Sequence, residues 1–520
     1  MLKFVQRFAS HVCGVLSGFD RLRFRGTKRL LACVRGLASY LWNQQILFKD
    51  FAAFAQDTTA RLRHAIEDNA HALGRPVVYV PSTNTAKEDL ARDIAQRDGI
   101  TSGLIAVLTC VEPCLSFAAR GNRTTKLLDL RLERMKCLHY YCYFLDAEVG
   151  LVHARLQSWF PFTVQICLNG REWLAQQLDR VGVAYRRQAN ALVAVADVAV
   201  AQQLLEQQLT VCWPALLERL LQASHPGHEH LLPGRPVPYY WSVDESEWAS
   251  DVLFASPEAL AEHMPLFVRH GMQALHSEDV LRFLGRKLPA TGQLPMNFTG
   301  EVVSSLKRRP EGVRVGHRLN RNWIKMYDKQ GSVLRVETVI NDASDFKVYR
   351  TKEGEPDGPQ AWRQLRKGVA DLHRRAEVSQ KANERYLDSL AGVAEPRPLG
   401  EVAARLCQPV RWQGRRVRAL NPLAAEDVSL FQAVGRGEFL INGFRNRDLR
   451  VLLYGEAGSE SERRRQSGAV SRKLRLLRAH GVIQKVAKTH RYLLTEQGRT
   501  ALTALEAARQ ADTAKLLQAA

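Results

Sequence analysis

The sequence lacks the features of several common protein classes. No window of its 520 residues holds 18 consecutive apolar residues, the length that a membrane-spanning helix needs. It has no GxxxxGK[ST] phosphate loop and no GxGxxG dinucleotide motif. We therefore expect no membrane partner and no nucleotide or flavin cofactor.

Closely spaced cysteine pairs are also missing. The nine cysteines are odd in number and form no CxxC pair; the nearest neighbours are Cys110 with Cys114 and Cys137 with Cys142. A structural zinc site usually has closer pairs. We interpret the cysteines as reduced thiols, which is typical of a cytoplasmic protein.

Acidic residues are too few to balance the basic ones. The 74 Lys+Arg against 53 Asp+Glu give a net charge of +21. The 46% hydrophobic and 24% charged residues are ordinary for a globular chain. Such a positive surplus on a globular chain indicates a polyanionic partner, with nucleic acid as the first candidate. We expect the protein to be associated with the nucleoid.

The chain is long enough for two to four domains, and its mixture of helix and strand patterns predicts an α+β protein. We expect a large mixed sheet-and-helix body over 1–395, with a possible sub-boundary near 225–240. A linker or helical connector over 396–439 and a winged helix-turn-helix domain over 440–510 follow.

Local patterns predict the elements of the body. The first 75 residues read as mostly helical, apart from a strand-like insert. A later hairpin has Gln330 and Gly331 at its turn. The expected elements are a strand at 19–26, a strand–helix–strand unit at 75–82, 86–99 and 103–113, an antiparallel meander over 138–170, helices at 171–182, 196–222 and 246–284, the hairpin at 316–341 and a basic helical segment at 359–392.

Residues 440–505 resemble a winged helix-turn-helix. Helices are expected from Asn446 and at 472–478, with Gly481 as a cap, wing strands at 483–486 and 491–494, and a closing helix from Thr495. Between 445 and 500 there are 14 basic and 5 acidic residues. The resemblance implies a double-stranded DNA partner, although RNA, or a solvated basic face on a protein-binding module, stays open. The candidate nucleic-acid-binding residues are Arg472, Lys473, Arg475, Arg478, Lys485, Lys488 and Arg491.

The hairpin IKMYDK–LRVE carries the candidate chemistry. Alternation puts Lys325, Tyr327 and Lys329 on one face of the first strand, and Arg335 and Glu337 on one face of the second. Tyr327 is the candidate nucleophile toward phosphorus, Lys329 and Arg335 are candidate charge stabilisers, and Glu337 is a candidate metal ligand.

This YDK strand paired with an R-x-E strand resembles a feature of Rep-trans rolling-circle replication initiators and relaxases. The resemblance covers about 25 residues and implies DNA strand nicking with Tyr327, Lys329, Arg335 and Glu337 in the site. Asp20 is a candidate acidic position on an early strand. Two alternatives stay open: the hairpin is a cross-strand packing and ion-pair arrangement, or it contacts the DNA backbone without chemistry.

Two further groups are candidate metal ligands. Glu247 and Asp251 have the i,i+4 spacing that would place them on one face of the helix expected over 246–284. Together with Asp20 they would form a carboxylate site for Mg²⁺ or Mn²⁺, while a solvated helix face is the alternative. A Pro/Gly loop contains His225, His228 and His230. These histidines are either metal ligands helped by Glu229 or parts of a solvent-facing loop.

A second basic region precedes and follows the hairpin. Residues 303–375 include 17 basic and 9 acidic residues, among them Lys307, Arg308 and Arg309. Two basic regions favour an extended phosphate track. The sequence thus predicts a DNA-binding protein of a mobile element or plasmid that nicks DNA with a divalent metal, as a replication initiator, relaxase or transposase-like protein. A non-catalytic DNA-binding regulator and an RNA-binding ribonucleoprotein component are the alternatives.

Overall fold

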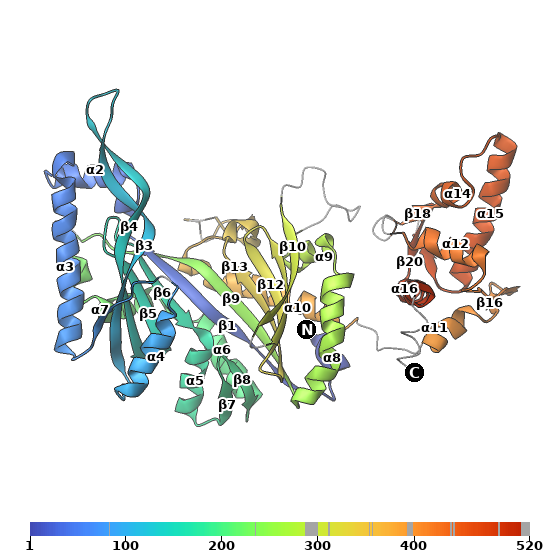
Figure 1. Ribbon diagram of the computed structural model, residues 1–520, viewed down its shortest axis with the longest axis horizontal. Helices are drawn as coiled ribbons and strands as arrows, with labels where there is room; N and C mark the ends of the chain where they lie inside the picture. The colour runs from blue at the N-terminus through green and yellow to red at the C-terminus, as the bar shows by residue number, and fades with distance from the viewer. Residues whose placement is uncertain are drawn as a thin grey trace. The chain divides into compact units, whose positions relative to one another are not determined.

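A computed structural model describes residues 1–510 apart from 83, 235, 287–299, 310–311, 353, 356, 393–398, 437–438, 440–442 and 487–488. The described chain forms two compact units (Figure 1). We call residues 1–286 with 300–392 the body, and residues 399–510 the C-terminal unit. Among the described residues, no helix combines the length and apolarity that crossing a membrane requires.

An eleven-stranded mixed sheet forms the centre of the body. Its order is β10-β11-β12-β13-β9-β1-β6-β5-β4-β3-β2. The β2–β3 pair is parallel and the other pairs are antiparallel. The strands are β1 Val12–Thr27, β2 Val77–Tyr79, β3 Gly103–Gly121, β4 Leu128–Asp146, β5 Gly150–Gln157, β6 Val164–Asn169, β9 Tyr240–Phe254, β10 Val302–Arg309, β11 Gly312–Leu319, β12 Asn322–Lys329 and β13 Val333–Ile340.

Helices and two small hairpins complete the body, which makes the protein α+β as expected. The hairpins are β7 Tyr185–Gln188 with β8 Ala191–Val195, and β14 Lys347–Arg350 with β15 Ala361–Gln364. The helices are α1 Leu2–Arg7, α2 Val34–Asn43, α3 Phe51–Ala72, α4 Lys87–Arg97, α5 Gly170–Val181, α6 Val198–Glu206, α7 Trp213–Ser224, α8 Pro257–Arg269, α9 Ser277–Phe283 and α10 Leu372–Leu390.

Two sets of helices cover opposite faces of the central strands. Asn383 of α10 donates hydrogen bonds to the backbone of β9 and β13, and accepts one from Thr338. On the other face, α5 and α6 pack against β1. The side chains of β9 and β13 alternate between these two faces. Because helices cover both faces, a polar side chain on either face lies close to other polar groups or to backbone.

Glycine permits the close packing of α5 on β1. A Cβ atom at Gly170, the first residue of α5, would lie 1.7 Å from the carbonyl oxygen of Phe19. The helix begins here because the Asn169 side chain accepts hydrogen bonds from the amides of Arg171 and Glu172. This combination sets the position of Arg171 against the sheet.

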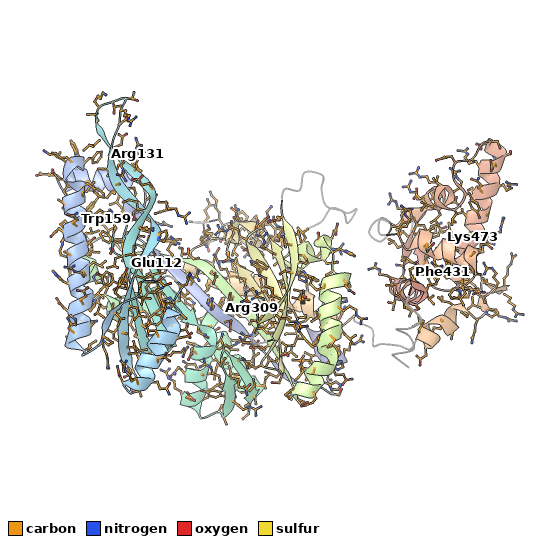
Figure 2. The ribbon with its side chains drawn as sticks, in the orientation of Figure 1. Glu112, Arg131, Trp159, Arg309, Phe431 and Lys473 are labelled. Carbon is orange, nitrogen blue, oxygen red and sulfur yellow. The ribbon has the colours of Figure 1, made fainter. Side chains whose placement is uncertain are left out.

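The strands β3 and β4 extend past their neighbours as a two-stranded arm (Figure 1). The last β4 residue paired with β5 is His139, whereas the β3–β4 ladder continues to Gly121 opposite Leu128. We define the arm as residues 111–138. Its six basic side chains are all exposed, and Figure 2 labels one of them, Arg131. They are Arg120, Arg123, Lys126, Arg131, Arg134 and Lys136.

The C-terminal unit contains small sheets and helices. Its core includes Leu474, Leu477 and Ile483. The β18–β20–β19 sheet is antiparallel, and Gly481 has a φ of 68° after α15. The elements are α11 Leu399–Leu406, β16 Val410–Trp412, β17 Arg415–Val417, α12 Ala425–Val434, β18 Phe444–Arg445, α14 Asn446–Tyr454, α15 Glu460–Ala479, β19 Ile483–Lys485, β20 Arg491–Leu494 and α16 Glu496–Gln510.

Several element predictions were right. The parallel β2–α4–β3 unit, the meander of β4, β5 and β6, helix α5 and the β12–β13 hairpin all form. The hairpin turn has a positive φ at both Gln330 and Gly331, as tight two-residue hairpin turns require. These elements rely on local alternation and turn residues, which the sequence displays directly.

Three element predictions differ in part from the structure. Residues 246–254 belong to strand β9 and not to a helix, because this segment pairs with both β1 and β13. Both faces of the strand are buried, and side chains at even spacing on one face of a strand also have the i,i+4 spacing of a helix face. β1 runs from Val12, well before the expected strand. Residues 361–364 form β15, and α10 begins only at Leu372. Residues 393–398, which span the expected boundary between the body and the linker, lie outside the described residues.

Candidate functional site

Four neighbouring strands carry the candidate catalytic residues. Lys325 of β12 pairs with Glu337 of β13, and Tyr327 pairs with Arg335. Across the next pair, Arg335 lies opposite Asp251 of β9. Because directly paired residues share a sheet face, these side chains lie together on the face covered by α5.

Three carboxylates from three successive strands converge at this place. They belong to Asp20 of β1, Glu247 of β9 and Glu337 of β13, and one ligand oxygen from each lies within 4.8 Å of the others. Asp20 lies where the β1–β9 register shifts between Phe19 and Arg21, an irregularity that turns side chains toward a site. We call these three residues the carboxylate site. Oxygen donors of this kind suit Mg²⁺ or Mn²⁺.

The tyrosine and a lysine touch this site directly. Tyr327 Oη donates a hydrogen bond to Glu337 Oε2 at 2.7 Å. Lys325 Nζ donates to Glu337 Oε1 at 2.7 Å and lies 3.5 Å from Glu247 Oε1. A single ammonium is therefore shared between two carboxylates, while the phenol faces a carboxylate oxygen at the distance that proton transfer needs.

Burial and mutual repulsion shift the pKa values of these groups. Burial raises the pKa of Glu247 to about 7, and the Glu337 charge adds to that rise. Burial opposes the ionisation of Glu337, but the Lys325 and Arg335 charges outweigh it and lower the Glu337 pKa. Burial also raises the pKa of Tyr327 well above its usual value, and the Glu337 charge raises it further. The phenol is thus protonated, beside an ionised carboxylate.

Asp251 and Arg335 form a separate ion network beside the carboxylate site. Arg335 Nε and Nη2 donate to Asp251 at 2.5 and 2.8 Å, and Arg335 Nη1 donates to Asp20 at 2.9 Å. Arg171 Nη2 of α5 lies 2.8 Å from Asp251 Oδ2. Asp251 is not among the three converging carboxylates; two guanidinium groups take the place that a metal was expected to have.

Lys329 lies at the edge of the same face. Its side chain is buried, and Nζ lies 5.9 Å from the centre of the Tyr327 ring. Arg335 is fully buried in its ion network. Of the two expected charge stabilisers, Arg335 is therefore held in a bidentate pair with Asp251, and Lys329 is the other cation beside the tyrosine ring.

Three contributions to the site were not foreseen from the sequence. Lys325 was part of the motif but was not expected to bridge two carboxylates. Arg171 reaches the site from α5, and its Nε and Nη1 atoms are buried without a hydrogen-bond partner among the described residues. Asn190, between β7 and β8, donates to both Asp20 oxygens. For Arg171, the local sequence indicated only that a helix begins at Asn169–Gly170, and not that this helix packs against the site.

The expected basic residues lie on strand β10 of the body and on α15, β19 and β20 of the C-terminal unit. Lys307, Arg308 and Arg309 are exposed on the edge strand β10 (Figure 2 labels Arg309). On α15, Arg472 and Arg475 are exposed, Lys473 pairs with Glu426, and the Arg478 guanidinium lies 5.2 Å from the Trp412 ring centre. Lys485 is exposed on β19 and Arg491 is partly buried on β20, while Lys488 lies outside the described residues.

The histidine loop differs from the expected metal cluster. His225 and His228 are buried, and His228 Nε2 lies 3.0 Å from Glu218 Oε1 of α7. The group that comes together is Glu218, His228 and Glu229, without His225 or His230. The fold places a helix beside the loop, which the loop sequence alone does not show.

The arrangement provides a hydroxyl nucleophile, a carboxylate base and a set of oxygen ligands within one small volume. Such a combination suits chemistry at a phosphodiester. Comparison of the chain with known protein families, with curated proteins and with solved structures finds no match.

Proposed function

We propose that the protein binds DNA and nicks one strand, with Tyr327 as the nucleophile and the carboxylate site as the holder of a divalent metal. The observation that carries this proposal is the 2.7 Å hydrogen bond from Tyr327 Oη to Glu337 Oε2, made within the group of Asp20, Glu247 and Glu337. The carboxylate that accepts the Tyr327 hydrogen bond is thus itself one of three converging carboxylates, which a purely structural tyrosine does not need.

The reaction would proceed by transesterification. The Tyr327 oxygen forms a bond to phosphorus as its proton passes to Glu337 Oε2. The bond from phosphorus to a sugar oxygen breaks, and that oxygen leaves as a hydroxyl with the proton that Glu337 took from Tyr327, returned to it through water. One DNA end then carries the protein through a phosphotyrosine, and Lys329, 5.9 Å from the ring, is positioned to balance charge on the phosphate.

Asp20, Glu247 and Glu337 are the residues that would hold Mg²⁺ or Mn²⁺. Their donor chemistry fits, since all three offer carboxylate oxygens and hard divalent cations take oxygen ligands. When bound, such an ion neutralises charge on the phosphate and on the attacking oxygen. Lys325, which lies between Glu247 and Glu337, would share these two carboxylates with the ion or turn its ammonium toward the DNA backbone.

Three basic surfaces support DNA as the partner. The C-terminal unit has the element order α14, α15, β19, β20, α16, which is compatible with a winged helix-turn-helix, and Arg472 and Arg475 are exposed on α15. The edge strand β10 exposes Lys307, Arg308 and Arg309. The arm is a two-stranded ribbon with six exposed cations, a shape that the major groove of DNA admits. This distribution favours a mobile-element or plasmid protein that recognises a site and processes it.

A second candidate is hydrolysis by water at the same carboxylate site. The raised pKa of Tyr327, caused by burial, favours this alternative because it makes the phenol a poorer nucleophile. In that reaction no protein stays attached to the DNA. The two candidates therefore differ in their products, and not only in the residues they use.

The test is a supercoiled-plasmid assay with Mg²⁺ or Mn²⁺, using DNA that flanks the gene of this protein. Wild type, Tyr327→Phe and Glu337→Gln are compared, with and without protease digestion. We expect nicked plasmid with attached protein, lost in Tyr327→Phe. Tyr79→Phe is the matched control, because Tyr79 is an exposed tyrosine of the same sheet.

Nicking that survives Tyr327→Phe would assign the chemistry to the carboxylates and water. Tight, salt-sensitive binding without nicking would leave a DNA-binding regulator. Preference for structured RNA over duplex DNA in competition would indicate the ribonucleoprotein alternative.

A further inference from the structure

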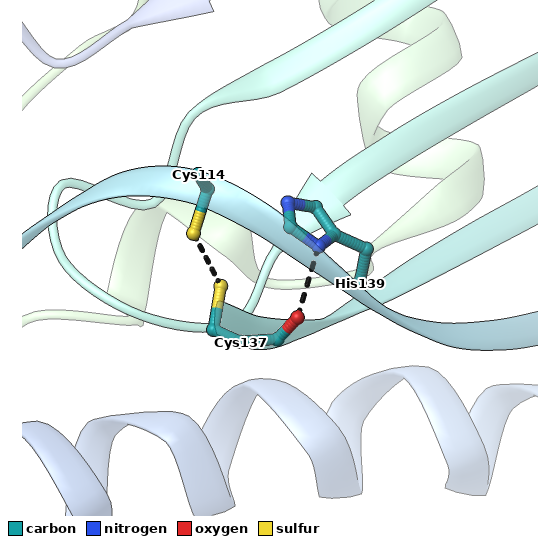
Figure 3. Close-up of side chains that lie close together, drawn as sticks. All are labelled: Cys114, Cys137 and His139. Atoms are coloured by element: carbon teal, nitrogen blue, oxygen red, sulfur yellow. Dashed lines mark hydrogen bonds between the residues drawn. The ribbon is translucent and has the colours of Figure 1, made fainter. Parts of the chain in front are cut away.

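Two cysteines and a histidine meet where the arm leaves the sheet (Figure 3). Cys114 lies on β3, and Cys137 and His139 lie on β4. The Cys114 and Cys137 Sγ atoms are 2.9 Å apart, and one ligand atom from each of the three residues lies within 4.8 Å of the others. The group lies on different strands from the carboxylate site and contains no carboxylate.

The histidine has a nitrogen free for a ligand. His139 is fully buried, and its Nδ1 lies 3.2 Å from the Cys137 carbonyl oxygen, to which it donates as an N–H. The Nε2 atom is buried and has no hydrogen-bond partner among the residues that the structure describes. A backbone carbonyl on one ring nitrogen, with the lone pair left on the other, is the usual arrangement of a metal-binding histidine.

We propose that Cys114, Cys137 and His139 bind a thiophilic divalent cation of the Zn²⁺ type at the root of the arm. Two sulfurs and an imidazole nitrogen are the donors that Zn²⁺ prefers. Metal–sulfur bonds of about 2.3 Å in tetrahedral geometry place two sulfurs roughly 3.7 Å apart. Binding therefore requires the two thiols to separate by less than about 1 Å, a small side-chain adjustment.

The fourth position falls to water or to a hydroxyl. Ser116 Oγ lies 3.1 Å from Cys114 Sγ and offers such a hydroxyl. The nearby Glu112 carboxylate is already used by Tyr141 and Arg155. The site thus offers three protein ligands, as in open zinc sites, and not a closed four-cysteine set.

The place of the site gives the cation a mechanical role. His139 is the last β4 residue that pairs with β5. Beyond it the segment 157–160 still bonds to the base of the arm, through Ser158 N to the Leu138 oxygen and Trp159 Nε1 to the Phe117 oxygen, and past Phe117 the β3–β4 ladder continues to Gly121 opposite Leu128. A two-stranded ribbon is marginally stable by itself. A cation bound to one residue of β3 and two of β4 joins both strands at this root and stiffens the arm.

The test uses the reduced full-length protein after chelation of bound metal. Co²⁺ is added as a spectroscopic probe, and the near-ultraviolet thiolate-to-Co²⁺ band is followed as Zn²⁺ displaces it. The carboxylate site has no sulfur and is silent in this band. We expect one equivalent of thiolate-bound Co²⁺ in wild type. Loss of either thiol should weaken Zn²⁺ binding by more than about 100-fold, since loss of a second-shell partner alone costs 10- to 100-fold.

The variants are Cys114→Ser, Cys137→Ser and His139→Cys, with Cys212→Ser as the control at an exposed cysteine. His139→Cys keeps a third donor, so its band persists and gains intensity, which shows that a lost band elsewhere is not a loss of folding. Zn²⁺ should also slow hydrogen exchange of arm amides in wild type and not in Cys114→Ser. Absence of the band in wild type, a band that survives Cys114→Ser, or a Cys114–Cys137 disulfide in place of metal binding would overturn the proposal.

Discussion

Glu247 and Asp251 lie four residues apart on the same strand and the same sheet face, yet their surroundings differ. Asp251 accepts hydrogen bonds from Arg335 and pairs with Arg171, and the same two guanidinium groups also lie against Asp20, so two cations balance two carboxylates. Glu247 shares the Lys325 ammonium with Glu337 and lies within reach of Asp20. One end of the face therefore has a cation for each carboxylate, and the other has one ammonium for two carboxylates.

The difference separates a structural role from a functional one. A buried carboxylate with complete partners holds neighbouring strands and a helix together, and its removal leaves charges buried without partners. A group of carboxylates with too few cations is unfavourable unless an additional cation binds there. The same residue types therefore serve stability at Asp251 and, in our proposal, chemistry at Glu247.

The largest expected effect is on nicking. Glu337→Gln keeps the side-chain shape but removes the base that faces Tyr327 Oη. We expect the nicking rate to fall by about 10²- to 10⁴-fold, the usual contribution of a general base. A time course on supercoiled plasmid measures it, with Glu301→Gln, an exposed carboxylate of the same body, as the control. Unchanged nicking in Glu337→Gln would remove this residue from the reaction.

The next effect is on stability. Asp251→Asn should lower the free energy of unfolding by about 3–5 kcal/mol, because Arg335 and Arg171 lose a buried counter-ion. Glu247→Gln should cost far less, since it relieves repulsion with Glu337 and Asp20. Denaturant unfolding of the two variants compares them directly. Equal losses would show that both carboxylates are structural.

Metal binding should stabilise the folded protein through the carboxylate site that includes Glu247, and not through Asp251. Mn²⁺ at 100 times its dissociation constant adds about 2.7 kcal/mol to the free energy of unfolding. We expect a corresponding rise in the Tm of wild type and no rise in Glu247→Gln. Thermal unfolding with and without chelator tests this, and a rise in Tm that survives Glu247→Gln would place the ion elsewhere.

The smallest effect is on pH dependence. The Glu247 pKa is raised to about 7, so between the unfolded pKa near 4.5 and about 7 the folded protein holds a proton that the unfolded chain has lost. This contribution to stability is present below pH 4.5 and disappears as the pH rises through 7. Without metal, Glu247→Gln should therefore gain stability relative to wild type as the pH rises from 5 to 7.5. A constant difference across that range would contradict the raised pKa.

Local pattern was enough for parts of the fold and the site. The alternation of residues 322–340 and the Gln330–Gly331 turn predicted the hairpin that brings Tyr327 toward Glu337. Asp20 and Glu247 were named as candidate ligands, although Glu247 was placed on a helix. The spacing i,i+4 puts two side chains on one face of a helix, and even spacing also puts them on one face of a strand.

The rest depends on contacts between distant segments. Arg171 and Asn190 lie about 150 residues or more from Asp20 in sequence, and only the packing of α5 and the β7–β8 hairpin on the sheet brings them there. Cys114 and Cys137 are 23 residues apart, so no cysteine motif shows them. Their proximity follows from the β3–β4 register, which the sequence does not display.

The measurement that tests the central claim most directly is the identification of the covalent product. The full-length protein is incubated with Mn²⁺ and a single-stranded oligonucleotide from the flanking DNA, digested with protease and analysed by mass spectrometry. We predict a nucleotide adduct on the peptide that contains Tyr327, absent from Tyr327→Phe and from Glu337→Gln. Strand cleavage without an adduct, or an adduct on another tyrosine, would contradict the account.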